Sequence, residues 1–193
     1  MANSDCNSKG QSPFRPVSRQ SGIFGMLLLL MGAFFSTSVA SEELRLKKIT
    51  AGFVFNFAKF IEWPQLSPAA PIRLCVYADQ EMLDIFAAFS GHRIAGHEVK
   101  IVAYSAKQLQ NCQVLYIDRS KQNDFQCAEA KRHARLLTVS NIDDFVRHCG
   151  MIGLFEKDNR LRFAINLNAV NHSELKMSSH LLRLAHIWQG KKQ

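Results

Sequence analysis

The sequence predicts an α/β fold, a single layered domain with a mostly parallel sheet covered by helices and a C-terminal β-hairpin. Short apolar segments alternate with amphipathic segments from residue 72 onward, a pattern typical of strands that alternate with helices. The run Val114–Ile117 is apolar throughout, as expected of a strand buried on both faces of a parallel sheet. Residues 150–167 read as two apolar strands on either side of a polar turn, which adds the antiparallel hairpin.

The N-terminal segment has the pattern of a secretory signal peptide. Three basic residues precede an apolar run at 23–35, and a stretch of small residues then ends at Ala40. The run of 13 residues is shorter than the roughly 20 that a helix needs to span a bilayer. We therefore expect export to the periplasm with cleavage after Ala40, so that 1–40 is the signal peptide and 41–193 is the mature domain.

The mature chain is moderately basic. The predicted signal peptide carries three basic residues and one acidic residue, so its removal lowers the formal net charge from +8 to +6 (8 − 3 + 1). The remaining basic pairs are short and scattered, without interleaved aromatic residues, which is unlike a nucleic-acid interface. We expect no nucleic-acid partner, and at most a weak attraction to acidic proteins or lipid headgroups.

The first helix of the mature domain is predicted at 42–63. Phe53, Phe57 and Phe60 recur there at helical spacing, and Pro64 stops the helix. The spacing gives the helix one dense aromatic face. We expect this face to pack against the sheet.

The remaining elements follow in order along the chain. Strands are predicted at Ile72–Tyr77, 99–103, Val114–Ile117 and 136–139. Between them we predict a helix that begins at the cap Asp79 and ends at Gly91, a short helix from Ser105, a polar helix at 124–134, and a short helix capped by Ser140. A closing helix at 178–188 places four apolar residues on one face: Leu181, Leu184, Ala185 and Trp188.

The hairpin has a register that its turn would fix. Asp158 and Asn159 both tolerate positive φ, so they suit a two-residue turn. Leu154 would then lie opposite Phe163, on the side of the sheet that faces the core. A three-residue turn would exchange the two faces. The side opposite the core would be covered either by a helix, for which the last helix is one candidate, or by another protein.

No catalytic or cofactor pattern stands out. The chain has no C-x-x-C motif and no histidines at metal-binding spacing, and the spacing Gly150-Met-Ile-Gly153 lies within a strand rather than at a strand-to-helix turn. The stretch Ser178-Ser179-His180 reads as a helix cap rather than a hydrolase site. We therefore expect a binding protein that is not an enzyme and needs no cofactor or metal.

Six stretches of the mature chain resemble the YfiR-like family of exported bacterial proteins, in the same order as in that family. They are AGFVFNFAKFIEWP (51–64), RLCVYAD (73–79), CQVLYI (112–117), LLTVSNIDDF (136–145), GMIGLFEKDNRLRFAINL (150–167) and LKMSSHLLRLAHI (175–187). The resemblance spans essentially the whole mature domain.

This resemblance implies a function and partners. It implies a periplasmic protein that binds the periplasmic sensor domain of a YfiN-like membrane diguanylate cyclase and holds the cyclase inactive. A YfiB-like outer-membrane lipoprotein would relieve the repression by sequestering this protein. The expected consequence is lower cyclic-di-GMP and less biofilm. We also expect a homodimer.

Four cysteines remain after cleavage, and in an oxidising compartment disulfides are the first interpretation. The resemblance implies that Cys75 pairs with Cys112, and two buried thiols are the alternative. Cys127 and Cys149 could form a second disulfide, remain as free thiols, or bridge two molecules.

Two interaction hypotheses follow for the surface. In the first, the hairpin and the short helix beside it bind the partner through Met151, Ile152, Phe155, Arg162, Ala164 and Asn166, because Met and Phe beside Arg are enriched at protein interfaces. In the second, the protein is a periplasmic small-molecule sensor. Its ligand would lie in a cleft near the strand ends that is lined by Phe57, Phe60 and Trp63.

Overall fold

The computed structural model describes residues 36–63, 66–148 and 150–190. The chain divides into two units, Met1–Glu42 and Glu43–Gln193, and the domain described below is the second. The apolar run of the predicted signal peptide lies outside the described residues, so that prediction stays open. Within the described part of the chain, no helix is both long enough and apolar enough to cross a membrane.

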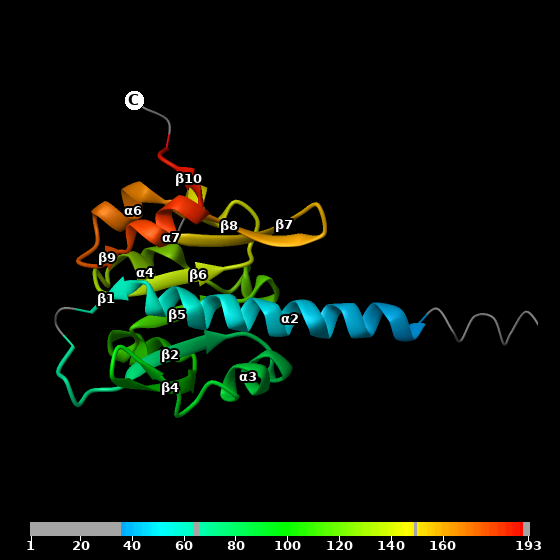
Figure 1. Cartoon of the computed structure of the whole chain (residues 1–193), viewed down its shortest axis with the longest axis horizontal. Coiled ribbons are helices and arrows are strands. Elements are labelled where there is room, and N and C mark those ends of the chain that lie inside the picture. Colours follow the sequence, from blue (N-terminus) through cyan, green and yellow to red (C-terminus); the bar gives the residue numbers. More distant parts are fainter. Residues whose placement is uncertain (1–35, 64–65, 149, 191–193) are drawn as a thin grey trace, which may run out of the picture. The chain divides into compact units, whose positions relative to one another are not determined.

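An eight-stranded sheet forms the centre of the domain, in the order β10-β8-β7-β6-β5-β2-β4-β3 (Figure 1). Neighbouring strands run parallel except for the pairs β3/β4 and β7/β8, which confirms the predicted fold class. The strands are β2 (Ile72–Tyr77), β3 (Arg93–Ile94), β4 (His97–Ala103), β5 (Val114–Ile117), β6 (Leu137–Ser140), β7 (Ile152–Lys157), β8 (Arg160–Asn166) and β10 (His186–Trp188). Two short strands, β1 (Ile61–Glu62) and β9 (Lys176–Met177), pair separately.

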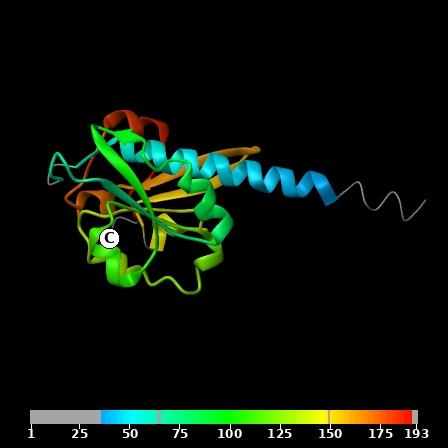
Figure 2. The same cartoon turned by 90° about the horizontal axis from the view of Figure 1, so that it is seen from below.

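Helices cover both faces of this sheet. They are α2 (Ser36–Lys59), α3 (Gln80–Ala87), α4 (Cys127–Lys131), α5 (Phe145–His148), α6 (Leu167–Asn171) and α7 (Ser179–Leu184), with the 3-10 turns η1 (Ala106–Asn111) and η2 (Arg119–Lys121). One core cluster joins the sheet to α2, α3 and α7, and a second joins it to η1, α4 and α5. Figure 2 shows the cyan part of α2 along one side of the sheet.

Helix α2 packs on the sheet as its aromatic spacing predicts. Val54 and Phe57 are buried, and the Phe57 and Phe163 rings lie 4.9 Å apart. The helix ends at Lys59, four residues before the predicted end. The reason is tertiary, because Ile61 pairs with Met177 of β9 and so leaves the helix before Pro64 is reached.

The C-terminal segment differs most from the prediction. Helix α7 ends at Leu184, and residues 186–188 form β10 instead of the rest of a helix. Strand β10 runs parallel to β8, with Ile187 opposite Ile165. Pairing with the open edge of β8 satisfies backbone groups that a helix would leave exposed there. The predicted shared face is therefore broken, since Leu184 is 62% exposed and Trp188 belongs to a strand.

Smaller differences lie elsewhere. The cap Asp79 is confirmed, because its carboxylate accepts a hydrogen bond from Met82 N at 2.8 Å. Ser140 is the last residue of β6, and its hydroxyl donates to Ile117 O at 2.7 Å and accepts from Ile142 N at 2.9 Å, but α5 begins only at Phe145, so Ser140 does not cap it. The predicted helix at 124–134 shortens to α4. Strands β3, β9 and β10 and helix α6 were not predicted.

A disulfide ties strand β2 to the segment between η1 and β5. Cys75 of β2 is bonded to Cys112, which directly follows η1, and their Cα atoms lie 5.9 Å apart. Both residues are buried. The pairing that the family resemblance implied is therefore present.

Candidate interaction surface

The hairpin of β7 and β8 has the predicted register. Leu154 lies opposite Phe163 and Ile152 opposite Ile165. The turn residues Asp158 and Asn159 have φ values of 53° and 55°, as a two-residue hairpin turn with both central residues left-handed requires. The apolar alternation and the turn therefore agree on which side chains face the core.

The short helix α5 covers the base of the opposite face. A Cβ atom added to Gly153 would lie 3.2 Å from Val146 Cγ1, so glycine allows the helix to approach this closely. Asn166 fixes the contact, because its Nδ2 donates to Val146 O at 2.7 Å. A helix does cover this face, but it is α5 rather than the last helix, which packs in the cluster on the α2 side of the sheet.

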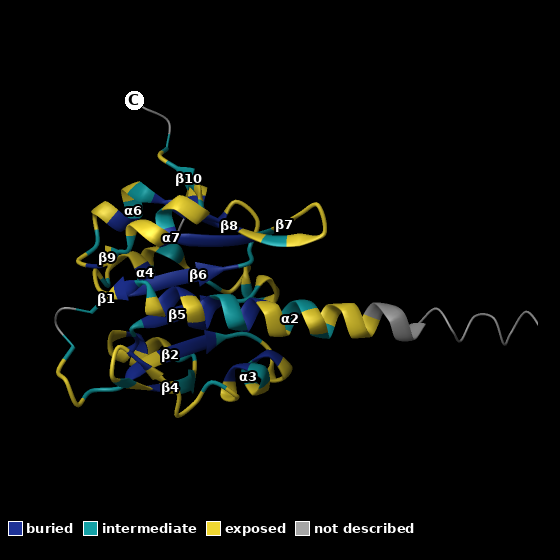
Figure 3. Ribbon diagram, viewed as in Figure 1, coloured by how far each residue is buried: buried dark blue, intermediate teal, exposed yellow. Residues whose placement is uncertain are grey.

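Only some of the residues predicted to bind the partner are accessible at the surface. Ile152 is 0% exposed and belongs to the core on the α2 side. Met151, Ala164 and Asn166 are also buried. Phe155 is partly exposed and Arg162 is exposed, and they stand opposite each other in the register. Figure 3 shows the change along the hairpin, from a buried base to an exposed tip. The accessible part of the predicted set is the pair Phe155 and Arg162.

A large hollow surrounds this pair, which we call the hairpin groove. It has a volume of about 900 Å³ and is lined by the hairpin, by α5 with the loop before it, and by the segment 184–188. Leu184, 62% exposed, is one of two large hydrophobic residues among those described that stand clear of the core. An exposed apolar side chain at the rim of a groove is a feature of interaction sites. The sequence did not predict Leu184 and Trp188 here because it placed both on the apolar face of one helix, whereas Leu184 ends α7 and Trp188 belongs to β10.

The edge of β8 is only half covered. Strand β10 pairs with residues 164–166 of β8, and within the described residues no strand lies beside 160–163 on that edge. Uncovered backbone groups of an edge strand can pair with another chain, and charged side chains are the usual protection against unwanted pairing. Arg160 and Arg162 occupy this stretch and are exposed.

The carboxyl ends of the parallel strands carry a second polar cluster. Ligands of doubly wound sheets commonly bind at such ends. In this protein the side chains there contact one another instead, and the rings of Tyr77 and Tyr104 lie 4.3 Å apart. Burial, with help from Glu129, raises the pKa of Tyr104 to about 12. Asp118 accepts hydrogen bonds from Tyr116 Oη, Asn141 Nδ2 and Ser120 N. These contacts hold loops together. Among the described residues, no group of three His, Cys, Asp or Glu side chains is placed to bind a metal.

In the described part of the chain, Phe57, Phe60 and Trp63 do not together line a cleft. Phe57 is buried in the core, and the Phe60 ring lies against His180 at 5.6 Å. Trp63 Nε1 donates to Ala58 O at 3.3 Å, and its side chain lines only a small cavity of about 150 Å³. Core packing therefore accounts for these three aromatic residues.

The second pair of cysteines is described only in part. Cys127, in α4, is disulfide-bonded, whereas Cys149 lies outside the described residues. Their pairing therefore stays a prediction.

Fold and groove together define an α/β protein whose surface suits the binding of another protein. A family model described as YfiR/HmsC-like matches residues 47–186, which is more than half of the chain. The chain belongs to the YfiR/HmsC-like family. No curated protein matches it. The family indicates a regulatory, periplasmic protein of diguanylate cyclase signalling.

Proposed function

We propose that this protein represses a membrane-bound diguanylate cyclase by binding the periplasmic sensor domain of that enzyme. The observation that carries the proposal is the family match, which runs from α2 to the first residue of β10 and so includes the other seven strands of the sheet in full. Repression would lower cyclic-di-GMP and biofilm formation. The chemistry would take place in the partner, so this chain needs only a surface that recognises the sensor domain.

The hairpin groove is the surface that we assign to this contact. Phe155 and Leu184 supply apolar area, and Arg162 supplies a planar cation that can bind a carboxylate with two hydrogen bonds. The uncovered stretch of β8 adds backbone donors and acceptors beside them. Aromatic and arginine side chains provide much of the binding energy at protein interfaces.

A binding measurement with a cellular readout tests the proposal. The mature chain, residues 41–193, is titrated by calorimetry with the periplasmic domain of a membrane-bound diguanylate cyclase from the same bacterium. Cellular cyclic-di-GMP is measured with and without the gene. We expect a saturable complex and a higher cyclic-di-GMP level when the gene is deleted. A deletion that leaves cyclic-di-GMP unchanged, with no complex in the calorimeter, would contradict the proposal.

Three further parts of the proposal are export of the protein, its self-association, and relief of the repression by an outer-membrane lipoprotein. Mass spectrometry of the periplasmic protein should find Ser41 as its first residue if the leader is cleaved after Ala40. Light scattering should give twice the monomer mass if the protein is a homodimer. A YfiB-like outer-membrane lipoprotein should compete with the cyclase domain for this chain, which a competition pull-down would measure.

A further inference from the structure

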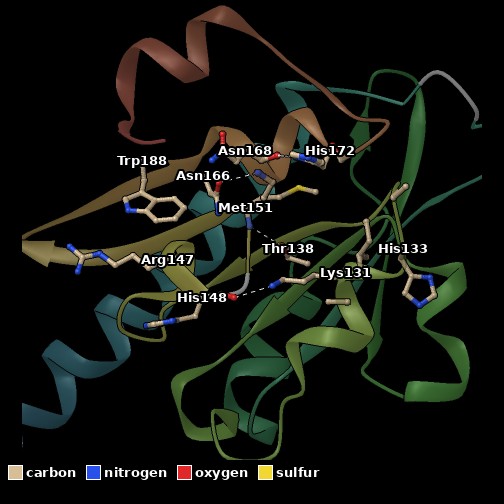
Figure 4. Close-up of a pocket in the computed structure, with 15 residues that line it drawn as sticks. Lys131, His133, Thr138, Arg147, His148, Met151, Asn166, Asn168, His172 and Trp188 are labelled. Carbon is tan, nitrogen blue, oxygen red and sulfur yellow. Dashed lines mark hydrogen bonds between the residues drawn. The ribbon is translucent and has the colours of Figure 1, made fainter. Parts of the chain in front are cut away.

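A cavity on the helix-covered face of the sheet opposite α2 has no role in the proposed contact. It has a volume of about 440 Å³, and its walls come from α4, α5, α6 and strands β6 and β10 (Figure 4). Two of its wall residues, Ala130 and Leu136, belong to the core cluster that includes α4 and α5. The volume falls within the roughly 300–1,000 Å³ that is typical of small-molecule sites. We call it the basic cavity.

The wall of the basic cavity has one sign of charge. No Asp or Glu lines it, whereas five basic or imidazole side chains do: Lys131, His133, Arg147, His148 and His172. Asp144, outside the cavity, pairs with Arg147 at 3.2 Å. A concave site lined by one sign of charge concentrates ions of the opposite sign. The cavity therefore favours an anion.

Lys131 is the side chain best placed to receive the negative group. Its Nζ reaches across the cavity and donates to His148 O at 3.1 Å (Figure 4). An ammonium group has three donor hydrogens, so two remain for an occupant. His172 lies on the α6 side, where its Nδ1 bonds to Asn168 O at 2.6 Å. A carbonyl oxygen can only accept, so Nδ1 carries the hydrogen, and Nε2 of the neutral ring is an acceptor; Lys131 is therefore the donor that we assign to the anion.

The rest of the cavity is apolar. The Met151 side chain and the Trp188 indole contribute to its walls, beside Leu136 and Ala169. Met151 is buried, with 8% of its surface exposed, and Trp188 is half-buried, so the Trp188 indole supplies most of the apolar surface that a ligand could cover. Small-molecule sites typically combine such apolar walls with a few convergent polar groups.

We propose that the basic cavity binds a small organic anion, whose carboxylate or phosphate group contacts Lys131 and whose apolar body lies against Met151 and Trp188.

The basic cavity adjoins the hairpin groove, which suggests what such a ligand would do. Arg147 and Trp188 line both hollows. Asn166, in the wall of the cavity, also donates the hydrogen bond that fixes α5 at the edge of the groove. An occupant of the cavity would thus change the affinity of the groove for its partner, and the partner would change the affinity for the occupant by the same factor. This regulatory step rests on the proposed function, whereas anion binding does not.

Calorimetry on the mature protein alone tests the binding site. The probes are phenylacetate, phenyl phosphate and the neutral phenylacetamide. We expect at least one of the two anions to bind about tenfold or more tightly than the amide, and the tighter anion identifies the preferred group. Equal affinity for the amide, or no measurable binding of any probe, would overturn the proposal.

Two variants and a control locate the site. Lys131→Met removes the proposed contact with the anion, and Ala134→Trp fills the mouth of the cavity without removing a charge, since Ala134 is an exposed wall residue. We expect Lys131→Met to weaken anion binding about tenfold and Ala134→Trp to abolish it. Lys100→Met changes an exposed lysine of β4 and should leave the affinity unaltered. Anion binding that neither cavity variant weakens would place the ligand elsewhere and reject the assignment.

The regulatory step has its own measurement. The titration with the cyclase domain is repeated with the cavity saturated by the tighter anion, and we expect the Kd to change at least threefold. The same anion should leave the Kd of the Ala134→Trp variant unchanged. An unchanged Kd in the wild type rejects the regulatory step. Failure of the cyclase domain to bind at all would count against the proposed function. The titrations of the protein alone would still show whether the basic cavity binds an anion.

Discussion

The buried amide of Asn166 joins β8 to α5, because its Nδ2 donates to Val146 O at 2.7 Å. The same side chain caps α6, since its Oδ1 accepts from Ala169 N at 3.0 Å. One residue therefore holds two of the three helices in the walls of the basic cavity, α5 and α6. Because Asn166 lines the basic cavity and its partner Val146 lines the hairpin groove, this hydrogen bond connects the two hollows.

Substituting Asn166 should destabilise the domain. Asn166→Ala leaves the Val146 carbonyl without its buried donor and removes the cap of α6, so we expect a loss of about 1–3 kcal/mol in the free energy of unfolding. Urea denaturation measures it. Asn166→Asp keeps the cap acceptor and loses only the donor, and hydrogen exchange should then find α5 less protected than α6. Asn171→Ala, at an exposed position, is the control, with a change within about 0.5 kcal/mol. An equal loss in the control would argue against the special role of Asn166.

Arg162 and Phe155 should decide partner affinity without affecting the fold. Both lie at the accessible part of the hairpin, so Arg162→Glu or Phe155→Ala should weaken binding to the cyclase domain by about 2 kcal/mol, the scale of an interface hot spot. Thermal unfolding should remain close to that of the wild type. Lys100→Glu makes the same charge change at an exposed position of β4 and should bind normally. Unchanged affinity in both hairpin variants would remove the hairpin from the interface.

The disulfide between Cys75 and Cys112 should contribute strongly to stability. It closes a sequence separation of 37 residues, and loop-closure entropy of that size corresponds to roughly 4 kcal/mol. The double variant Cys75→Ala with Cys112→Ala should therefore unfold at a much lower urea concentration, and reductant should have no further effect on this pair. A midpoint equal to that of the oxidised wild type would show that the bridge adds nothing to the stability.

The second bridge is testable by peptide mapping. Lys131 Nζ donates to His148 O, which brings α4 against the residue that precedes Cys149, and Cys127 is itself disulfide-bonded. We therefore expect no free thiol in the mature protein without reductant, and a cross-linked peptide that contains Cys127 and Cys149. Two free thiols, or a cross-link between two molecules, would contradict this pairing.

The sequence predicts local features of this fold better than its long-range contacts. The register of β7 and β8 follows from alternation and from two turn residues because a shift of one residue would expose the core side of both strands. Asp79 is predictable as a cap because its hydrogen bond lies within one helical turn. Strand β10 was missed because His186 to Trp188 follow a helical pattern, and only the open edge of β8 makes a strand the better state. The basic cavity could not be predicted either, because its walls come from segments far apart in the chain that only the fold brings together.

Asp118 should make the stability of the domain depend on acid. Burial alone would raise the pKa of this carboxyl, but hydrogen bonds from Ser120, Tyr116 and Asn141 outweigh it and hold the pKa below its usual value of 3.8. A carboxyl whose pKa is lower in the folded state stabilises the fold above its unfolded pKa, and this contribution is lost as the pH falls through the folded pKa. Stability from Asp118 should thus be complete above about pH 5 and decline below 3.8.

The variant Asp118→Asn isolates this contribution. Its amide nitrogen cannot accept from Asn141 Nδ2, so we expect a loss of roughly 1–3 kcal/mol at pH 7 by urea denaturation. The difference from the wild type should shrink as the pH is lowered below about 4, because the wild-type carboxyl then binds a proton, first in the unfolded state and at lower pH in the folded state. Asp124→Asn, at an exposed position, should show neither effect. A difference between Asp118→Asn and the wild type that is the same at pH 3 and pH 7 would mean that the stabilisation comes from the shape of the side chain and not from its charge.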